Sequence, residues 1–333
     1  MPATMPATMP GAGSGARRVA ANDVGTNTVL LLVAEARPGG AVALAERAEI
    51  TRLGRGVDAT GRLVPAAIAE TVAVLAAYAA EARALGVTAI DCVATSAARD
   101  AGNGADFFEA VQASAGLTPR IISGDEEARL VYASAWRDFG AVASGGGSPG
   151  RLAVLDVGGG STEFTFGDGP DTLGRRSLQV GAVRLTERHV GEDPMGPATL
   201  AKLRQAARQA LAPLAGMGGT GGAGAPGRLI GVAGTVTTLA AVEQALPSYD
   251  AERVHGSPLS RATLERLLGR LAGLPLAERA RLPGMEPKRA DVIVAGAVVV
   301  AEAMALTGFE TLTVSDRGVR WGLVHELLSA PGY

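Results

Sequence analysis

The sequence predicts an α/β fold with two domains, and three observations lead to this prediction. Apolar strand-like runs alternate with helical segments from residue 19 onward, which is typical of α/β proteins with parallel or mixed sheets. The length of 333 residues exceeds the usual size of a single core. The triplet Asp-Val-Gly follows an apolar run twice, at residues 23–25 and 156–158, separated by about one domain length.

The second triplet lies in Leu152–Phe166, where an apolar strand is followed by a carboxylate, a run of glycines and a second strand. Three consecutive glycines allow backbone conformations that are closed to other residues, so several N–H groups can converge on one anion. Asp156 and Glu163 on either side of this loop suit a hydrated Mg²⁺ that bridges to phosphate oxygens. The alternative is a tight β-hairpin whose carboxylates are solvated.

The first triplet opens a similar loop. Asp23 ends a strand over 19–23, and small polar residues over 25–28 lead into a strand over 29–34. Two related phosphate loops on two domains would face each other across a cleft. This pair is the strongest inference from the sequence, because neither loop alone is specific, and a chance recurrence of so short a pattern is the alternative.

The chain between the two loops predicts a strand over 41–51, a turn over 58–61, a helix over 65–84, a strand over 87–95, a helix over 103–115, a strand over 120–122 and a helix from 123 to about 139. Arg99 follows the strand 87–95 at its carboxyl end, where open α/β sheets bind ligands. Its planar guanidinium can bind phosphate through two parallel hydrogen bonds. The alternative is a surface charge pair between Arg99 and Asp100.

Ser123 and Glu126 have the spacing of a helix capping box. This motif accounts for Glu126 and leaves Glu127 without a capping role. A second carboxylate in the first helical turn, near the junction of the domains, can face the cleft and orient a water molecule. Glu127 is therefore the predicted general base.

After the second loop, the sequence predicts β-structure over 172–183, helices over 198–214 and 239–246, a mobile glycine-rich loop over 216–227, a strand over 228–233, a loop over 255–259, helices over 260–272, 277–281 and 287–307, a strand over 311–315 and a helix over 318–328. Gly234 and Thr235 join the strand 228–233 to the following helix. This is a third turn compatible with an anion, because a helix N-terminus supplies free donors. Ordinary strand–helix packing explains it equally well.

These observations give three sets of predicted site residues. Glu127 and Arg99 are the predicted catalytic residues, and Asp156 and Glu163 are the predicted metal ligands. The predicted phosphate-binding residues are Asp23, Gly25, Thr26, Asn27, Gly158, Gly159, Gly160, Ser161, Gly234 and Thr235. Mg²⁺ is the expected cofactor, with Mn²⁺ as the alternative.

Composition narrows the class of protein. A hydrophobic fraction of 47% and a charged fraction of 19% fit a globular protein. The net charge of −2 gives no basic field that would attract nucleic acid, so no nucleic-acid partner is expected. Cys92 is the only cysteine, which excludes a disulfide framework and predicts a reducing, cytoplasmic location. The three histidines, His189, His255 and His325, lack metal-ligand spacing, so each is interpreted as structural.

No run of about 18 or more uncharged apolar residues occurs in the sequence, so no membrane partner is expected. Residues 1–16 carry a repeat of small, uncharged, Pro-rich residues and are expected to form a disordered leader. Arg17 and Arg18 are not followed by the apolar run of an export signal. The two domains are expected over 17–124, completed by a closing helix over 317–330, and over 125–316.

With these motifs in place, the chain resembles the Ppx/GppA phosphatase family, which comprises exopolyphosphatases and guanosine pentaphosphate phosphohydrolases. The resemblance covers nearly everything from Val19 to Leu328. It rests on the motifs DVGTNT, RLGRGVDATGRL, ATSAARD, ISGDEEARL, LDVGGGSTEF, GVAGTVTTLAA and SDRGVRWGL.

This resemblance implies two ribonuclease-H-like (actin-like ATPase) domains around a phosphate-binding cleft. It implies that Glu127 activates water, that Asp156 and Glu163 lie near a divalent metal, and that Arg99 and the two glycine loops contact phosphate. The long bacterial members carry C-terminal helical domains, including a His-Asp type domain. This chain resembles the short two-domain members, which lack the surface thought to hold long polyphosphate.

The expected reaction is metal-dependent hydrolysis of the terminal phosphoanhydride bond of inorganic polyphosphate, with release of orthophosphate. The same chemistry on guanosine pentaphosphate (pppGpp) is the nearest alternative. A non-catalytic actin-like nucleotide-binding sensor is an alternative of another class, and a sugar or acetate kinase on the same fold is a third. A homodimer is a further expectation, because dimers are common among enzymes of this shape.

Overall fold

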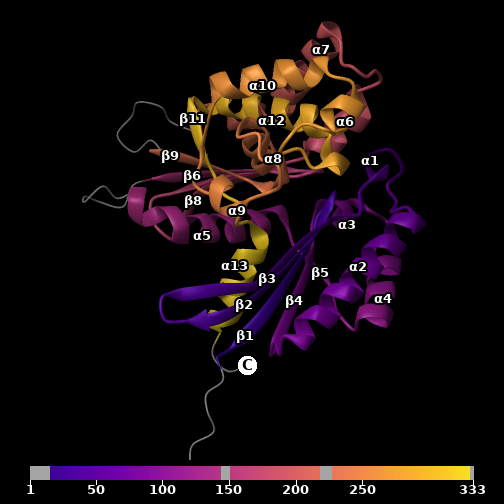
Figure 1. The fold of residues 1–333 in the computed structure, drawn as a ribbon, viewed down its shortest axis with the longest axis vertical. Helices are drawn as coiled ribbons and strands as arrows, with labels where there is room; N and C mark the ends of the chain where they lie inside the picture. Colours follow the sequence, from indigo (N-terminus) through magenta and orange to yellow (C-terminus); the bar gives the residue numbers. More distant parts are fainter. Residues whose placement is uncertain (1–15, 144–150, 218–226, 331–333) are drawn as a thin grey trace, which may run out of the picture.

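The structure is a computed structural model, and it describes residues 16–143, 151–217 and 227–330. The predicted leader up to residue 15, residues 144–150 and most of the predicted glycine-rich loop over 216–227 lie outside the described residues. Two β-sheets, each with its own helices, form two lobes (Figure 1).

The first sheet has the strand order β3-β2-β1-β4-β5. Its strands are β1 (Arg18–Val24), β2 (Thr28–Arg37), β3 (Gly40–Ile50), β4 (Ala89–Ala94) and β5 (Arg120–Ile121). Strands β1, β2 and β3 form an antiparallel meander, and β4 and β5 continue the sheet parallel to β1. We call this sheet with its helices α1–α4 the first lobe.

The second sheet repeats this arrangement. Its strands are β6 (Leu152–Val157), β7 (Thr162–Gly167), β8 (Thr172–Leu178), β9 (Arg228–Val232), β10 (Pro258–Ser260) and β11 (Thr311–Val314). The order β8-β7-β6-β9-β11, with an antiparallel meander and then two parallel strands, matches the first sheet, and β10 extends the edge. The predicted α/β fold of two ribonuclease-H-like, actin-like units is confirmed.

Helices cover the outer face of each sheet. The first lobe carries α1 (Val57–Thr60), α2 (Pro65–Ala84), α3 (Ser96–Asp100) and α4 (Gly104–Ala115). The second lobe carries α6 (Ala182–His189), α7 (Pro197–Ala210), α8 (Ala233–Glu243), α9 (Ala251–Val254), α10 (Arg261–Gly273), α11 (Leu276–Arg279), α12 (Ile293–Thr307) and the 3₁₀ turns Ala212–Leu214 and Pro287–Arg289. Helices α7, α10 and α12 stack above the second sheet in Figure 1.

Helix α2 is the one helix among residues 16–143, 151–217 and 227–330 that is long and apolar enough to cross a membrane. Glu70 and Glu81 interrupt its apolar sequence, and Leu75 and Ala79 are fully buried. The helix packs against α4 and the strands of the first sheet. Its apolar composition is therefore explained by the core that it covers.

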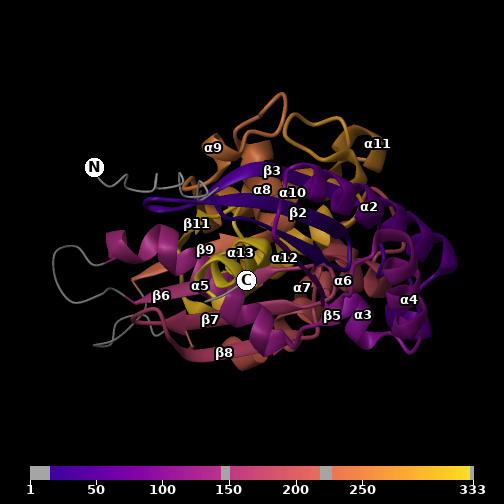
Figure 2. The same cartoon turned by 90° about the horizontal axis from the view of Figure 1, so that it is seen from below.

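Two further helices lie between the sheets. Helix α5 (Gly124–Ala143) packs against the second sheet, and α13 (Val319–Ser329) packs against β1 and β2 of the first. The two helices also pack against each other, so the layers between the lobes run sheet, α13, α5, sheet (Figures 1 and 2). The predicted division of the chain into residues 17–124 with 317–330 and residues 125–316 stays a prediction.

The structure corrects several local predictions. The predicted turn over 58–61 contains the short helix α1, and the helix predicted over 239–246 is α8, which begins at Ala233 and ends at Glu243. The predicted β-structure over 172–183 ends at Leu178, and residues 182–189 form helix α6. The predicted loop over 255–259 contains the short strand β10, which gains its hydrogen bonds only by pairing with β11. The predicted helix over 287–307 is a 3₁₀ turn followed by α12. Strand β10 shows how pairing with a segment distant in sequence can override a local pattern.

Candidate active site

The two predicted phosphate loops adopt the same turn. The amide of Gly25 donates to the carbonyl of Thr28 over 3.0 Å, and the amide of Gly158 donates to the carbonyl of Ser161 over 3.0 Å. A Cβ added to Gly25 or to Gly158 would lie 3.1 Å from that same carbonyl oxygen. The recurrence of Asp-Val-Gly in the sequence therefore corresponds to a recurrence of backbone structure.

The loops lie against each other at the cleft between the lobes. A Cβ on Gly159 would lie 3.0 Å from Cβ of Thr26, and a Cβ on Gly160 would lie 2.8 Å from Oγ1 of Thr26. The tip of the first loop thus contacts the tip of the second. The prediction that the two loops meet across a cleft agrees with this geometry.

Hydrogen bonds from a neighbouring segment fix the orientation of the first loop. The carbonyls of Thr26 and Asn27 accept hydrogen bonds from the amides of Gly54 and Arg52, over 2.8 Å and 3.0 Å. In a trans peptide the N–H points away from the C=O of the same unit. The amides of Asn27 and Thr28 are therefore directed away from the supporting segment.

Helix α6 supports the second loop in the same manner. The amides of Ala182 and Val183 donate to the carbonyls of Gly158 and Gly159, each over 2.9 Å. Nε of Arg184 donates to the carbonyl of Gly160 over 2.8 Å. The three amides that follow these carbonyls, at residues 159–161, point away from α6, and in the described chain they make no hydrogen bond. Converging free amides of this kind bind anions.

Both loops line one cavity of about 680 Å³ between the lobes. The predicted site residues that line it are Asp23, Gly25, Thr26, Asn27, Glu127, Asp156, Gly158, Gly159, Gly160, Ser161, Gly234 and Thr235. Arg99 and Glu163 do not line it and lie beside its carboxylates. Residues drawn from four separated stretches of sequence therefore converge on one space.

Four acidic residues gather at this cavity, and all are buried or nearly so. Burial, with repulsion from Asp156, raises the pKa of Asp23 to about 7 and that of Glu163 to about 8. Burial alone raises the pKa of Asp156 to about 6. Burial, followed by repulsion from Glu163 and Asp156, raises the pKa of Glu127 well above its ordinary value. These shifts indicate negative charge that the protein itself does not compensate.

Glu127 lines the cavity, but the predicted capping box next to it forms only in part. Oγ of Ser123 accepts a hydrogen bond from the amide of Glu126, and the carboxylate of Glu126 pairs with Arg120 over 2.6 Å rather than closing the capping box. Glu127, one residue further, turns inward and is 8% exposed. Its Oε2 makes no hydrogen bond and lies 3.6 Å from Nη1 of Arg99.

Arg99 lies in α3, directly after β4. Its Nη1 donates to the carbonyl of Ile122 over 2.9 Å, and its Nη2 is buried without a hydrogen-bond partner. The alternative of a pair with Asp100 is not observed, because Asp100 binds Arg184 instead. An arginine with a free donor beside a free carboxylate suits a site that is completed by a ligand.

The residues present fit a magnesium ion. Asp156 and Glu163 lie directly opposite each other on β6 and β7, and Oδ1 of Asp23 is buried without a hydrogen-bond partner. Within the described residues, no three His, Cys, Asp or Glu side chains form a ready-made metal cluster. Mg²⁺ does not need one, because it keeps several waters and takes further oxygens from a substrate phosphate.

The N-terminus of α8 supplies the third predicted turn. Gly234 and Thr235 lie in its first turn, where the amides have no partner within the helix. A Cβ on Gly234 would lie 1.9 Å from Nη1 of Arg289. The absence of a side chain at Gly234 leaves the space that this guanidinium occupies.

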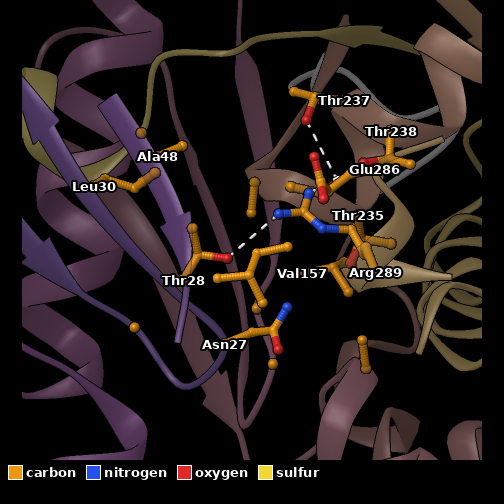
Figure 3. Close-up of a pocket in the computed structure, with 18 of the residues that line it drawn as sticks. Asn27, Thr28, Leu30, Ala48, Val157, Thr235, Thr237, Thr238, Glu286 and Arg289 are labelled. Atoms are coloured by element: carbon orange, nitrogen blue, oxygen red, sulfur yellow. Dashed lines mark hydrogen bonds between the residues drawn. The ribbon is translucent and has the colours of Figure 1, made fainter. Parts of the chain in front are cut away.

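Arg289 is a site residue that the sequence did not reveal. Its guanidinium donates to Oγ1 of Thr238 over 3.1 Å and to Oγ1 of Thr28 over 3.3 Å, so it joins the second lobe to the first (Figure 3). This guanidinium is only partly buried, and among the described residues it forms no ion pair. The only sequence feature that marks Arg289 is the Pro-Lys-Arg turn around it, and such turns are common on protein surfaces.

The single cysteine and the histidines play no part in this cavity. Cys92 is buried, and burial raises the pKa of its thiol to about 12, as expected for a packed core thiol. His255 binds Asp316 over 3.1 Å and stacks on Phe139, and His325 packs beside Trp321. None of the three histidines lines the cavity.

Residues 32–330 match the Ppx/GppA phosphatase family. The chain belongs to this family. Among its relatives, exopolyphosphatase 2 of Mycobacterium tuberculosis is 38% identical over 326 residues, which cover 93% of this chain and 98% of that protein. Exopolyphosphatase 1 of Mycobacterium leprae is 31% identical over 308 residues, which cover 92% of this chain and 88% of that protein.

Solved structures agree with this assignment. The crystal structure of the Aquifex aeolicus member of the Ppx/GppA family has a TM-score of 0.77 to this structure and 32% sequence identity. The match covers 96% of this chain and 100% of the Aquifex chain. An exopolyphosphatase from Cytophaga hutchinsonii, at 24% identity and a TM-score of 0.82, shares the fold. Family membership makes this protein a phosphoanhydride hydrolase, as the sequence predicts.

Proposed function

We propose that this protein is a metal-dependent exopolyphosphatase, which hydrolyses the terminal phosphoanhydride bond of inorganic polyphosphate and releases orthophosphate. The observation that carries the proposal is the convergence, in one cavity, of two anion-binding loops from different lobes with buried, uncompensated carboxylates. The relatives named exopolyphosphatases support polyphosphate as the substrate.

The loops are the proposed holders of successive phosphoryl groups. Their free amides are fixed by the hydrogen bonds from residues 52–54 and from α6, so they need not reorganise as charge develops in the transition state. In phosphoryl transfer most of the catalysis is positioning and electrostatic stabilisation. Asp156 and Glu163 are the proposed ligands of Mg²⁺, which when bound neutralises phosphate charge.

Glu127 is the proposed base that orients and activates the attacking water. Its buried carboxylate has a raised pKa, which makes it more basic than an exposed glutamate. Arg99, with its free Nη2, is the proposed contact to the transferred phosphoryl group. Arg289 extends the positive lining of the cavity toward the next phosphates.

Glu127→Gln tests the base assignment. We expect kcat for phosphate release from tripolyphosphate to fall by about 10²–10⁴-fold, the usual contribution of a general base, with KM nearly unchanged. Glu126→Gln is the matched control, because Glu126 lies in the same helical turn but pairs with Arg120 and should keep wild-type turnover. Undiminished turnover in Glu127→Gln would exclude this role.

Metal removal tests the proposed cofactor. We expect EDTA-treated protein to release no phosphate, and Mg²⁺ to restore release in a titration followed by a colorimetric phosphate assay. In Asp156→Asn the Mg²⁺ concentration for half-maximal rate should rise, because one hard oxygen donor is lost. Mn²⁺ is tested in parallel. Full activity in EDTA would rule out the metal requirement.

A second candidate substrate is pppGpp, and one part of the cavity favours it. Leu30, Ile50 and Met285 give that part an apolar wall, and the exposed Tyr249 stands at its margin. An aromatic ring can stack on a purine base. Competition between pppGpp and tripolyphosphate, with long polyphosphate and ATP in the same panel, decides between them. Tight nucleotide binding without phosphate release would instead favour a non-catalytic sensor. Transfer of a phosphoryl group to a sugar or to acetate would favour a kinase.

A further inference from the structure

Arg184 lies behind the glycine loop rather than inside the cavity. It is in the first turn of α6, and it lines a small recess between the lobes together with Asp58 and Asp100. Its side chain is 13% exposed. It does not line the large cavity, so any effect on the reaction must pass through other residues.

The guanidinium of Arg184 uses all of its nitrogen atoms. Nε donates to the carbonyl of Gly160 over 2.8 Å. Nη1 donates to Oδ1 of Asp58, and Nη2 donates to Oδ2 of Asp100 over 2.5 Å and to Oε1 of Gln179 over 3.1 Å. Asp58 and Asp100 belong to the first lobe, whereas Gly160 belongs to the second. One planar side chain thus joins the two lobes.

Each partner of Arg184 leads to a different part of the site. Gly160 is in the second loop, and the bond to its carbonyl directs the next amide away from α6. Asp58 follows the segment Arg52–Gly54, whose amides hold the first loop. Asp100 ends α3, the helix that carries Arg99. Arg184 is therefore connected to both loops and to the arginine beside the proposed base.

Neighbouring residues reinforce this junction. Arg188 donates to both oxygens of Asp58 over 2.5 Å and 2.6 Å, and Oε1 of Glu187 accepts a hydrogen bond from the amide of Gly56 over 3.0 Å. Gly181 lets α6 approach the loop, because a Cβ there would lie 2.5 Å from the backbone of Gly159. The close approach of α6 to the loop is thus built into the sequence.

We propose that Arg184 is a positioning residue for phosphoanhydride hydrolysis: it orients the second phosphate loop and holds the first loop and the helix of Arg99 in register with it. The expected loss of kcat/KM in variants of Arg184 rests on the proposed function. The geometric part of the inference, the alignment of two anion-binding loops across the lobes, stands without the identity of the substrate.

The test compares Arg184 with an arginine of similar bonding that has no link to the cavity. Arg204 of α7 binds Glu302 over 2.9 Å and also binds Glu265, all within the second lobe. Arg184→Ala and Arg204→Ala each break a semi-buried network, so both should lower Tm. Only Arg184→Ala is expected to lower kcat/KM for tripolyphosphate, by about 10²-fold, the cost of a misplacement of about 1 Å at the reacting groups.

Arg184→Lys sharpens this comparison. Lysine keeps the charge but cannot present the planar fork that serves one carbonyl and two carboxylates together. We expect about a tenfold loss of kcat/KM in Arg184→Lys and no loss in Arg204→Lys. If Arg184→Ala and Arg204→Ala have the same kcat/KM at equal loss of Tm, the positioning role is excluded.

Two further measurements do not depend on turnover. Tripolyphosphate binding by calorimetry should weaken in Arg184→Ala and not in Arg204→Ala. Spin labels at the exposed Ala69 and Ala201, changed to cysteine, report the distance between the lobes, because the native Cys92 is buried. We expect this distance distribution to broaden in Arg184→Ala. If the wild type releases no phosphate, the proposed function is wrong. The role of Arg184 is then also wrong if tripolyphosphate binding and the distance between the lobes are unchanged in Arg184→Ala.

Discussion

The two phosphate loops have the same turn but different side chains. The first carries Thr26 and Asn27 where the second carries Gly159 and Gly160. Thr26 occupies the space that side chains on the second loop would need. The glycines are therefore required by the loop opposite them, in addition to any freedom that they give their own backbone. The loops are complementary rather than symmetric, and this allows them to approach one anion together.

The largest effect is expected from giving the second loop a side chain. In Gly160→Ala the new Cβ would lie 2.4 Å from Oγ of Ser96 and 2.8 Å from Oγ1 of Thr26, which forces the loops apart. We expect kcat/KM for tripolyphosphate to fall by about 10²-fold or more. Gly191→Ala, at an exposed glycine with no atom within 4 Å of the new Cβ, is the control and should behave as wild type. Equal kinetics in the two variants would contradict the packing argument.

A smaller effect is expected from removing the side chain of the first loop. Thr26→Gly creates no clash but removes the side chain that contacts Gly159 and Gly160, and it adds backbone freedom worth about 1 kcal/mol. We expect kcat/KM to fall by about tenfold and Tm to fall slightly. Thr26→Ser restores Oγ1 without the methyl group and should recover most of the loss. Full activity in Thr26→Gly would mean that the loops need no contact.

The smallest effect is expected from the pH dependence of Asp58. This residue links the segments that support the two loops. The hydrogen bonds from Arg188, with the charge of Arg184, hold the pKa of Asp58 below its ordinary value. A lowered pKa contributes stability above the ordinary pKa of about 4, and this contribution is lost as pH falls through the lower folded value. We expect wild type to exceed Asp58→Asn in Tm by about 2–4 °C at pH 6.

This difference should shrink as pH falls from 6 to 3, because the Asp58 carboxylate begins to take up a proton. Asp106→Asn, at an exposed acid of α4, is the control and should track wild type throughout. Thermal unfolding followed by fluorescence from pH 6 to pH 3 provides the measurement. A constant difference across this range would assign the effect of Asp58 to packing rather than to charge.

Much of the fold was predictable because local patterns agree with the final structure. The alternation of strands and helices gave the α/β class, and the repeated Asp-Val-Gly corresponds to the ends of β1 and β6, the central strands of both sheets. Ser123 accepts the amide of Glu126 as the capping pattern predicts, and this pattern left Glu127 as the predicted base, although the carboxylate of Glu126 pairs with Arg120. Each of these signals can be recognised in a short stretch of sequence, without knowledge of its partners in the fold.

The rest could not be predicted because it depends on contacts between distant residues. Arg184 and Asp58 are separated by 126 positions, and no spacing rule links them. Helix α6 begins with amides that bind the glycine loop, so its start is determined by a partner outside the helix. Arg289 becomes a site residue only because its turn lies against Thr28 of the other lobe. The roles of the predicted site residues stay predictions until the variants are measured.

The position of α13 has a consequence for how the chain is made on the ribosome. Arg17, beside β1, donates to the carbonyl of Leu327 over 2.6 Å, and Val19 shares a buried cluster with Trp321. The inner face of the first strands therefore has no covering helix until more than 300 further residues have been synthesised. Nascent chains that stall before α13 emerges should leave an apolar sheet face open to chaperones, however complete the second lobe has become.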